Sequence, residues 1–95
     1  MQVTGKVVVV TGGASGIGKA LCEAFHRAGA AKVVVVDINP DGARAVATPI
    51  GGAAFKCDVG KEKDILHVIE ATEAQFGPIA LFCSNAGIGG GFDPL

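Results

Sequence analysis

The sequence lacks any apolar run long enough to cross a membrane. Its longest uninterrupted apolar stretches, such as 33–36 and 79–83, hold four or five residues, whereas a membrane-spanning helix needs about twenty. The N-terminus leads directly into a predicted strand and has no secretion-signal layout. We therefore expect a soluble, cytoplasmic protein that does not engage a membrane.

An excess of charge of either sign is also missing. Eight Lys and Arg stand against nine Asp and Glu, a formal net charge of −1, and the basic residues are spread along the chain. A nucleic-acid-binding surface needs clustered positive charge. We expect no nucleic-acid partner. The composition, 49% hydrophobic and 18% charged, is otherwise that of one small globular domain.

Paired cysteines are absent as well. The three cysteines (Cys22, Cys57 and Cys83) are far apart, no C-x-x-C pair occurs, and His26 and His67 are not close to any of them in sequence. A metal or redox site would need ligands at closer spacing. We expect no metal and three small, buried or half-buried thiols in a reducing compartment.

What the chain does contain is a regular alternation of apolar strands and amphipathic helices. Helical crossovers of this length join parallel strands with right-handed connections, which predicts an α/β fold with a doubly wound parallel sheet in the order βαβαβαβ. The predicted strands are 6–11, 32–37, 53–58 and 79–84; the predicted helices are 16–28, a short one at 39–47, and 61–76.

The apolar positions of the first predicted helix follow helical spacing. They define an apolar face that we expect to cover the sheet, made of Ile17, Leu21, Ala24, Phe25 and Ala28. Lys19 lies elsewhere on this helix and is expected to face solvent. Gly29 is a natural C-terminal cap.

A glycine-rich bend, T-G-G-A-S-G-I-G at 11–18, lies between the first strand and the first helix. Glycines let backbone N–H groups approach a pyrophosphate without a β-carbon in the way, and the helix start adds a partial positive charge. The spacing is G-x-x-x-G-x-G, so the strict G-x-G-x-x-G fingerprint is absent. A phosphate-binding bend is favoured; a plain glycine-rich turn is the alternative.

A second phosphate-binding motif overlaps this bend. The stretch 13–20 reads G-A-S-G-I-G-K-A, one residue short of the P-loop of nucleoside triphosphatases, G-x-x-x-x-G-K-[S/T]. Ala20 has no hydroxyl to bind magnesium, which argues against a triphosphatase.

An acidic residue, Asp37, ends the second predicted strand. In a βαβ unit this position faces the adenosine ribose, and a carboxylate there accepts hydrogen bonds from both hydroxyls. It would repel the 2′-phosphate of NADP, and no basic residue offsets this, because Ser15 and Ile38 occupy the obvious places. The pattern favours NAD; an acidic strand end in water is the alternative.

Together these motifs resemble the short-chain dehydrogenase/reductase family. The shared features, in order, are T-G-G-A-S-G-I-G at 11–18, Asp37, C-D-V at 57–59 and S-N-A-G at 84–87. The resemblance covers essentially the whole chain. It implies a Rossmann-type sheet in the order 3-2-1-4 and a nicotinamide dinucleotide cofactor.

The resemblance also implies roles for individual residues. The bend and the first helical turn would line the pyrophosphate, Asp37 the adenine ribose, Asp58 and Val59 the adenine, and the segment after the fourth strand the wall beside the nucleotide. The implied cofactor-binding residues are Gly12, Ser15, Gly16, Ile17, Gly18, Asp37, Ile38, Asp58, Val59, Asn85, Ala86 and Gly87. Asn85 would also brace the central strands. Ser84 departs from the asparagine that is usual in the family. Two of these assignments have structural alternatives: Asp58 as a helix-capping carboxylate, and residues 85–87 as a simple turn.

The family's catalytic Tyr-x-x-x-Lys pair is not in this chain, which contains no tyrosine. We therefore expect residues 1–95 to form the NAD-binding portion of an alcohol or carbonyl oxidoreductase, with no catalytic residue and no activity alone. A free-standing, non-catalytic NAD-binding module is the alternative. In the implied sheet order the fourth strand is left as an apolar edge, which predicts weak stability, self-association or homo-oligomers.

Overall fold

Valine-rich segments form the centre of a four-stranded parallel sheet in the computed structural model, which describes residues 2–85. The strands are β1 (Val7–Thr11), β2 (Lys32–Asp37), β3 (Ala53–Lys56) and β4 (Ile79–Ser84), and the helices are α1 (Gly16–Arg27), α2 (Pro40–Ala47) and α3 (Glu62–Phe76), with a 3-10 turn at Thr48–Ile50. The predicted alternation of elements is therefore confirmed.

The strand order is β3-β2-β1-β4, and all three neighbouring pairs are parallel. This confirms the predicted doubly wound order. All the strands end at the same edge of the sheet, so the segments that follow them are brought together there. A register shift between Val7 and Val8 interrupts the β1–β4 pairing.

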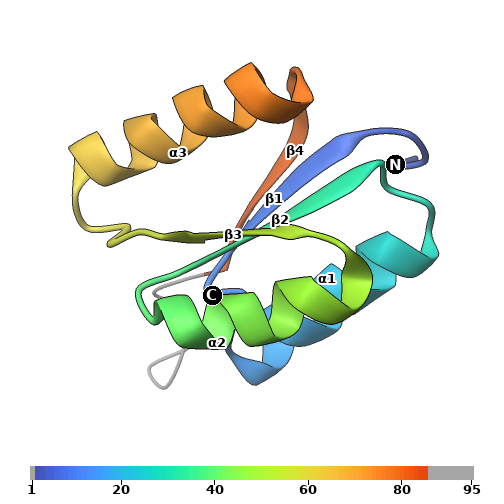
Figure 1. Cartoon of the computed structure of the whole chain (residues 1–95), viewed down its shortest axis with the longest axis horizontal. Coiled ribbons are helices and arrows are strands. Elements are labelled where there is room, and N and C mark those ends of the chain that lie inside the picture. Colours follow the sequence, from blue (N-terminus) through green and yellow to red (C-terminus); the bar gives the residue numbers. More distant parts are fainter. Residues whose placement is uncertain (1, 86–95) are drawn as a thin grey trace, which may run out of the picture.

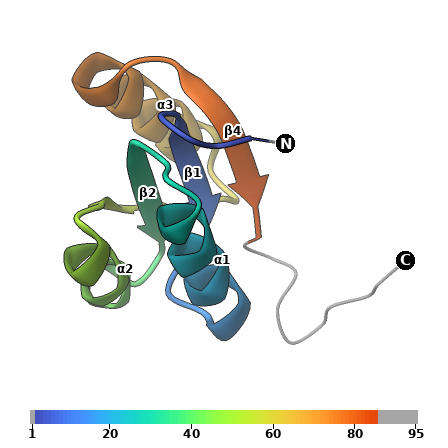
Figure 2. The same cartoon turned by 90° about the vertical axis from the view of Figure 1, so that its right-hand side faces the viewer.

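Helices cover both faces of the sheet: α1 and α2 lie on one side and α3 on the other (Figures 1 and 2). The strand valines alternate between the two resulting cores. Val8, Val10, Val33 and Val35 pack toward α1 and α2, whereas Val7, Val9, Val34 and Val36 pack toward α3. Burial on both faces explains why these strands are continuous apolar runs rather than alternating ones.

Several predicted boundaries were wrong by one or two residues. β1 begins at Val7 rather than Lys6, and α3 begins at Glu62, with Lys61 as its N-cap. β3 ends at Lys56 rather than Asp58, because the Asp58 amide donates to the Asp64 carboxylate (3.0 Å) and leaves the ladder.

The predicted apolar face of α1 was also partly wrong. Ile17 is 61% exposed, and Ala24 and Ala28 are exposed too. The buried positions are Gly18 and Cys22, flanked by half-buried Leu21 and Phe25. The helix turns Gly18 inward because this residue, lacking a side chain, lets the helix approach the bend after β1.

The two edge strands of the sheet are β3 and β4. Within residues 2–85, the only partner of β4 is β1. Its apolar side chains at Ile79, Leu81, Phe82 and Cys83 are half-buried. Among the helices of this described part, none is long and apolar enough to span a membrane.

Candidate functional site

The bend after β1 turns at Gly12, whose φ of +66° lies in the left-handed region that favours glycine. Its carbonyl oxygen is the hub of the bend: it accepts from the Ser15 amide (3.2 Å), the Ser15 hydroxyl (2.7 Å) and the Asn85 side-chain amide (3.2 Å). The bend is therefore braced by the segment following β4 as well as by itself.

Two glycines let the bend pack tightly. A β-carbon at Gly13 would lie 2.5 Å from Val35 Cγ1. A β-carbon at Gly18 would meet the Gly12 carbonyl and would lie 2.8 Å from the Gly13 Cα. These positions require glycine for internal packing, whereas a β-carbon at Gly16 would meet nothing within 4 Å. Gly16 therefore borders open space at the start of α1.

Ser15 is the N-cap of α1. Its hydroxyl accepts from the Gly18 amide (3.3 Å), and its carbonyl accepts from the Lys19 amide (2.7 Å). The first amides of a helix have no intrahelical acceptor. The Lys19 bond is the ordinary first bond of the helix, so Ser15 satisfies only the Gly18 amide among these, and the amides of Gly16 and Ile17 have no acceptor among residues 2–85. They mark a place for an anion at the positive end of α1.

Asp37 lies beside this bend at the end of β2. One carboxylate oxygen accepts from the Ala14 amide (3.0 Å) and the other from the Asn39 amide (3.0 Å). Each oxygen keeps a further lone pair for a ligand. The carboxylate is therefore held in one orientation next to the bend. Ile38, the following residue, is 61% exposed.

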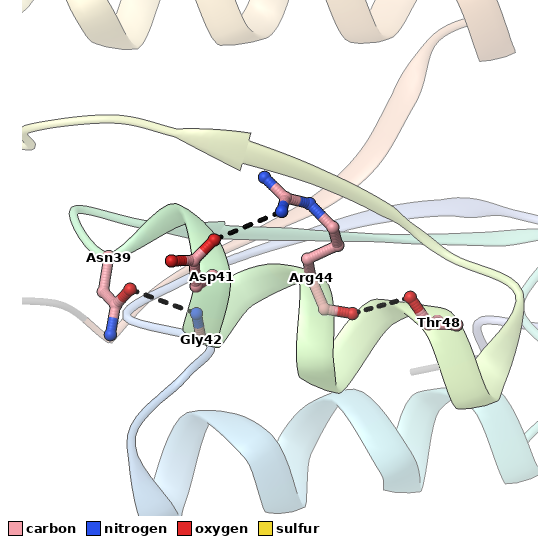
Figure 3. A network of polar contacts seen from close by, with 5 residues as sticks. All are labelled: Asn39, Asp41, Gly42, Arg44 and Thr48. Carbon is pink, nitrogen blue, oxygen red and sulfur yellow. Dashed lines mark hydrogen bonds and ion pairs between the residues drawn. The ribbon is translucent and has the colours of Figure 1, made fainter.

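The start of α2 borders the same carboxylate. Asn39 caps this helix by accepting from the Gly42 amide (3.1 Å), and Asp41, in the first turn, pairs with Arg44 (3.2 Å), as Figure 3 shows. Gly42 allows this close packing, because its β-carbon would lie 2.9 Å from the Ala14 β-carbon. The start of α2 is thereby packed against the glycine-rich bend.

Asn85 joins the end of β4 to the bend. Its backbone amide donates to the Thr11 hydroxyl (2.9 Å), which in turn donates to the Cys83 carbonyl (3.3 Å). Its side-chain amide donates to the Gly12 carbonyl and to the Ser15 hydroxyl (3.2 Å each). This agrees with a bracing role for Asn85. Ala86 and Gly87, also predicted site residues, lie outside the described residues.

Asp58 and Val59 follow β3 in a turn that leads to α3. The Asp58 carboxylate accepts from the Gly60 amide (2.9 Å), and the Cys57 amide donates to the Asp37 carbonyl (3.0 Å). The turn is therefore tied to the end of β2, and Asp58 and Val59 are both half-buried. The Asp58 side chain closes this local turn. The alternative prediction that Asp58 caps the helix was wrong, because the N-cap of α3 is Lys61 and no side chain caps it.

Sequence reasoning missed three partners that fix this site: Ala14, Asn39 and Asp64. Asn39-Pro40 carried a signal, since asparagine before proline is a common start of a helix. Ala14 carried none, because only its backbone N–H takes part and its partner is 23 residues away. Asp64 likewise gave no indication that its carboxylate would bind the Asp58 amide.

The thiols are protonated groups of the interior rather than reactive ones. Burial, with smaller contributions from the nearby Cys83 and Glu23, raises the pKa of the Cys22 thiol to about 11. Burial also raises the pKa of Cys57, together with the charges of Asp64 and Asp58. As predicted, Cys22 and Cys57 are buried and Cys83 is half-buried.

Comparison with known proteins adds independent information. The model of a family described as short chain dehydrogenase matches residues 6–94. A relative named tropinone reductase-like 1, from Erythroxylum coca, is 46% identical over 89 residues, covering 92% of this chain and 32% of the relative. The chain therefore spans about a third of that relative's length.

Two solved structures have the same fold. One, described as ribose-5-phosphate isomerase from Brucella melitensis 16M, has a TM-score of 0.84 and 34% identity over 90% of this chain and 33% of that chain. The other, a hydroxysteroid dehydrogenase from Escherichia coli, has a TM-score of 0.80 and 35% identity over 90% and 38%. Their different names illustrate that a shared fold does not specify one reaction. The family model, which matches nearly the whole chain, does specify the lineage: the chain belongs to the short-chain dehydrogenase family.

Proposed function

We propose that residues 1–95 form the NAD-binding portion of an oxidoreductase that acts on an alcohol or carbonyl substrate. The observation that carries this proposal is the juxtaposition of two first-turn amides, at Gly16 and Ile17, that have no acceptor among residues 2–85, with the Asp37 carboxylate held beside the same bend by Ala14. The amides suit a diphosphate and the carboxylate suits a ribose diol.

The residues present fit a nicotinamide dinucleotide. Gly16 leaves room where a β-carbon would stand in open space, and Asp37 retains acceptor capacity on both oxygens. Asp58 and Val59 are proposed to border the adenine, and Asn85 to 87 the wall beside the nucleotide. The bound dinucleotide would supply the hydride acceptor or donor; this chain's own residues bind and orient it.

NAD is the proposed form of the cofactor. The Asp37 carboxylate would repel a 2′-phosphate by roughly 1 kcal/mol or more at a separation of a few Å. Residue 38 is an isoleucine and residue 15 a serine, so neither adds a compensating cation. Ala20, which has no hydroxyl for a metal, is consistent with a dinucleotide rather than a triphosphate with magnesium.

Calorimetric titration of the chain with NAD and NADP tests this proposal. We expect NAD to bind more tightly, and Asp37→Ala to narrow the preference by about tenfold, because it removes both ribose hydrogen bonds and the repulsion. Asp41→Ala, which removes an equal charge from an exposed ion pair on α2, is the matched control. Absence of binding by either nucleotide, or an unchanged preference in Asp37→Ala, would contradict the proposal.

A second candidate is a free-standing NAD-binding module without catalysis. The bend at the start of α1 and the Asp37 carboxylate held beside it would serve such a module equally well, since these groups bind the cofactor and do not transfer the hydride. Both candidates bind NAD. They differ in whether the gene encodes further residues with a Tyr-x-x-x-Lys pair, and reading the open reading frame beyond residue 95 separates them.

We also propose that this chain self-associates through β4. An edge strand presents unpaired N–H and C=O groups to other chains, and the apolar side chains of β4 remain half-buried. Sedimentation velocity over a range of concentrations is expected to show a mass that rises with concentration. A monodisperse monomer that unfolds cooperatively would contradict this expectation.

A further inference from the structure

We propose that Asp37 is a positioning residue of the phosphate-binding bend, in addition to its proposed contact with the ribose. This inference rests on the proposed nucleotide function and assigns a second role within the same site. Its basis is the hydrogen bond from the Ala14 amide to a carboxylate oxygen of Asp37 (3.0 Å), which joins the bend to the end of β2.

Among the residues that the structure describes, the Ala14 amide has the Asp37 carboxylate as its acceptor. The preceding amide, at Gly13, donates to the Val36 carbonyl (3.0 Å) and continues the pairing of β1 with β2. At Ala14 the chain has left the strand, and the acceptor is the Asp37 side chain instead of the backbone. The Asp37 carboxylate therefore extends the ladder by one step into the bend.

The opposite side of the bend is held separately. There the Asn85 side chain donates to the Gly12 carbonyl and to the Ser15 hydroxyl, which caps α1. The bend is thus fixed from β2 by Asp37 and from β4 by Asn85. The Ala14 bond has a charged acceptor and is therefore stronger than a neutral hydrogen bond. Loss of Asp37 releases Ala14, and the amides of Gly16 and Ile17, which have no acceptor within residues 2–85, are then held less rigidly in place.

The two roles of Asp37 make opposite predictions for a ligand without ribose hydroxyls. If the carboxylate served the hydroxyls alone, its removal would leave the affinity for 2′,3′-dideoxyadenosine 5′-diphosphate unchanged or improve it, since one negative charge is lost. If it also positions the bend, Asp37→Ala weakens this ligand by about three- to tenfold, because preorganisation of the amides is lost.

The experiment measures the affinity of 2′,3′-dideoxyadenosine 5′-diphosphate, by calorimetry or ligand-observed NMR, for the wild-type chain, Asp37→Ala and Asp41→Ala. Asp41→Ala reports the effect of removing a nearby charge without touching the bend. Weaker binding in Asp37→Ala alone supports the inference. Equal or tighter binding in Asp37→Ala, or equal weakening in Asp41→Ala, overturns it.

A second measurement needs no ligand. Hydrogen exchange of the Ala14 amide, followed by NMR, is expected to accelerate about tenfold or more in Asp37→Ala, while Val8 to Val10 in β1 keep their protection. Unchanged Ala14 exchange overturns the inference even if the chain binds no nucleotide, and absence of nucleotide binding with accelerated exchange overturns only the proposed function. If Asp37→Ala does not fold, the isosteric Asp37→Asn, which offers one acceptor oxygen to two amides, takes its place.

Discussion

Replacing Gly18 by alanine is expected to destabilise the fold, whereas the same replacement at Gly16 is expected to weaken only nucleotide binding. The two glycines are in the first turn of α1, two residues apart, and their surroundings are opposite. A β-carbon at Gly18 would meet the Gly12 carbonyl and lie 2.8 Å from the Gly13 Cα. A β-carbon at Gly16 would have nothing within 4 Å.

The size of the destabilisation expected for Gly18→Ala follows from which atoms must move. The atoms that an alanine at 18 would meet are backbone, so no side chain can rotate away, and α1 must shift from the bend after β1. Overpacking of this kind costs about 1–3 kcal/mol or more. Alanine regains up to about 1 kcal/mol of helix propensity. The net loss, about 1–2 kcal/mol, is a substantial share of the roughly 5–15 kcal/mol that stabilises a typical domain.

At Gly16 only the propensity gain applies, so Gly16→Ala is expected to match or exceed wild-type stability by a few tenths of a kcal/mol or more. Its new methyl group would stand in the open space beside the amides of Gly16 and Ile17. If a diphosphate binds there, the affinity for NAD falls in Gly16→Ala while the fold stays intact.

Urea unfolding followed by far-ultraviolet circular dichroism measures the stability, because the chain has no tryptophan or tyrosine for fluorescence. Calorimetric titration with NAD measures the binding. Gly18→Ala with wild-type stability would refute the packing argument. Gly16→Ala with reduced stability, or with full affinity for NAD, would refute the view that its open space belongs to a ligand.

Three further perturbations test other parts of the structure. Burial raises the pKa of Cys22 from 9.0 to about 11, so the thiol of the unfolded chain loses its proton at a lower pH than that of the folded chain. Urea titrations should therefore show a free energy of unfolding that falls as pH rises between about 9 and 11, and that falls less in Cys22→Ala. A free energy of unfolding that does not change over this pH range would contradict the prediction. Asn85→Ala removes the bonds to the bend, including that to Ser15, and should cost about 1–2 kcal/mol and weaken NAD binding; full affinity would exclude the bracing role. Lys32 lies at the end of the sheet opposite to the glycine-rich bend. Lys32→Met removes the hydrogen bond from its ammonium group to the Gly51 carbonyl (2.9 Å) and the contact of that group with the Phe76 ring (5.1 Å). It should lower the free energy of unfolding by about 1 kcal/mol without changing the affinity for NAD.

The buried strands and the position of the glycine-rich bend could be predicted from the sequence. The valine runs at 7–10 and 33–36 predicted strands buried on both faces, and both are buried in the centre of the sheet. The glycine-rich bend and Asp37 were predicted to belong to one site, since parallel strands place their C-terminal ends at one edge, and the structure places them side by side. Element ends were less accurate, because they depend on single hydrogen bonds such as that from Asp58 to Asp64.

The face of α1 shows why the rest could not be predicted. Helical spacing favoured Ile17, Ala24 and Ala28 as buried residues, yet all three are exposed. The orientation of the helix is decided by the contact of Gly18 with the bend. That close approach requires a residue without a side chain, so Gly18 faces inward and the apolar Ile17 is left exposed. Hydrophobic periodicity describes the side chains of one element and carries no information about where a neighbouring backbone lies.

The sequence by itself determined the class of fold, the order of elements and the residue types from which a nucleotide site can be built. Only the tertiary structure decided which backbone amides donate hydrogen bonds to those residues and which have no acceptor among residues 2–85. Asp37 and Ala14 are the example: the carboxylate is visible in the sequence, but its partner is a backbone N–H present at almost every residue. Such a partner is selected by the path of the chain rather than by side-chain identity.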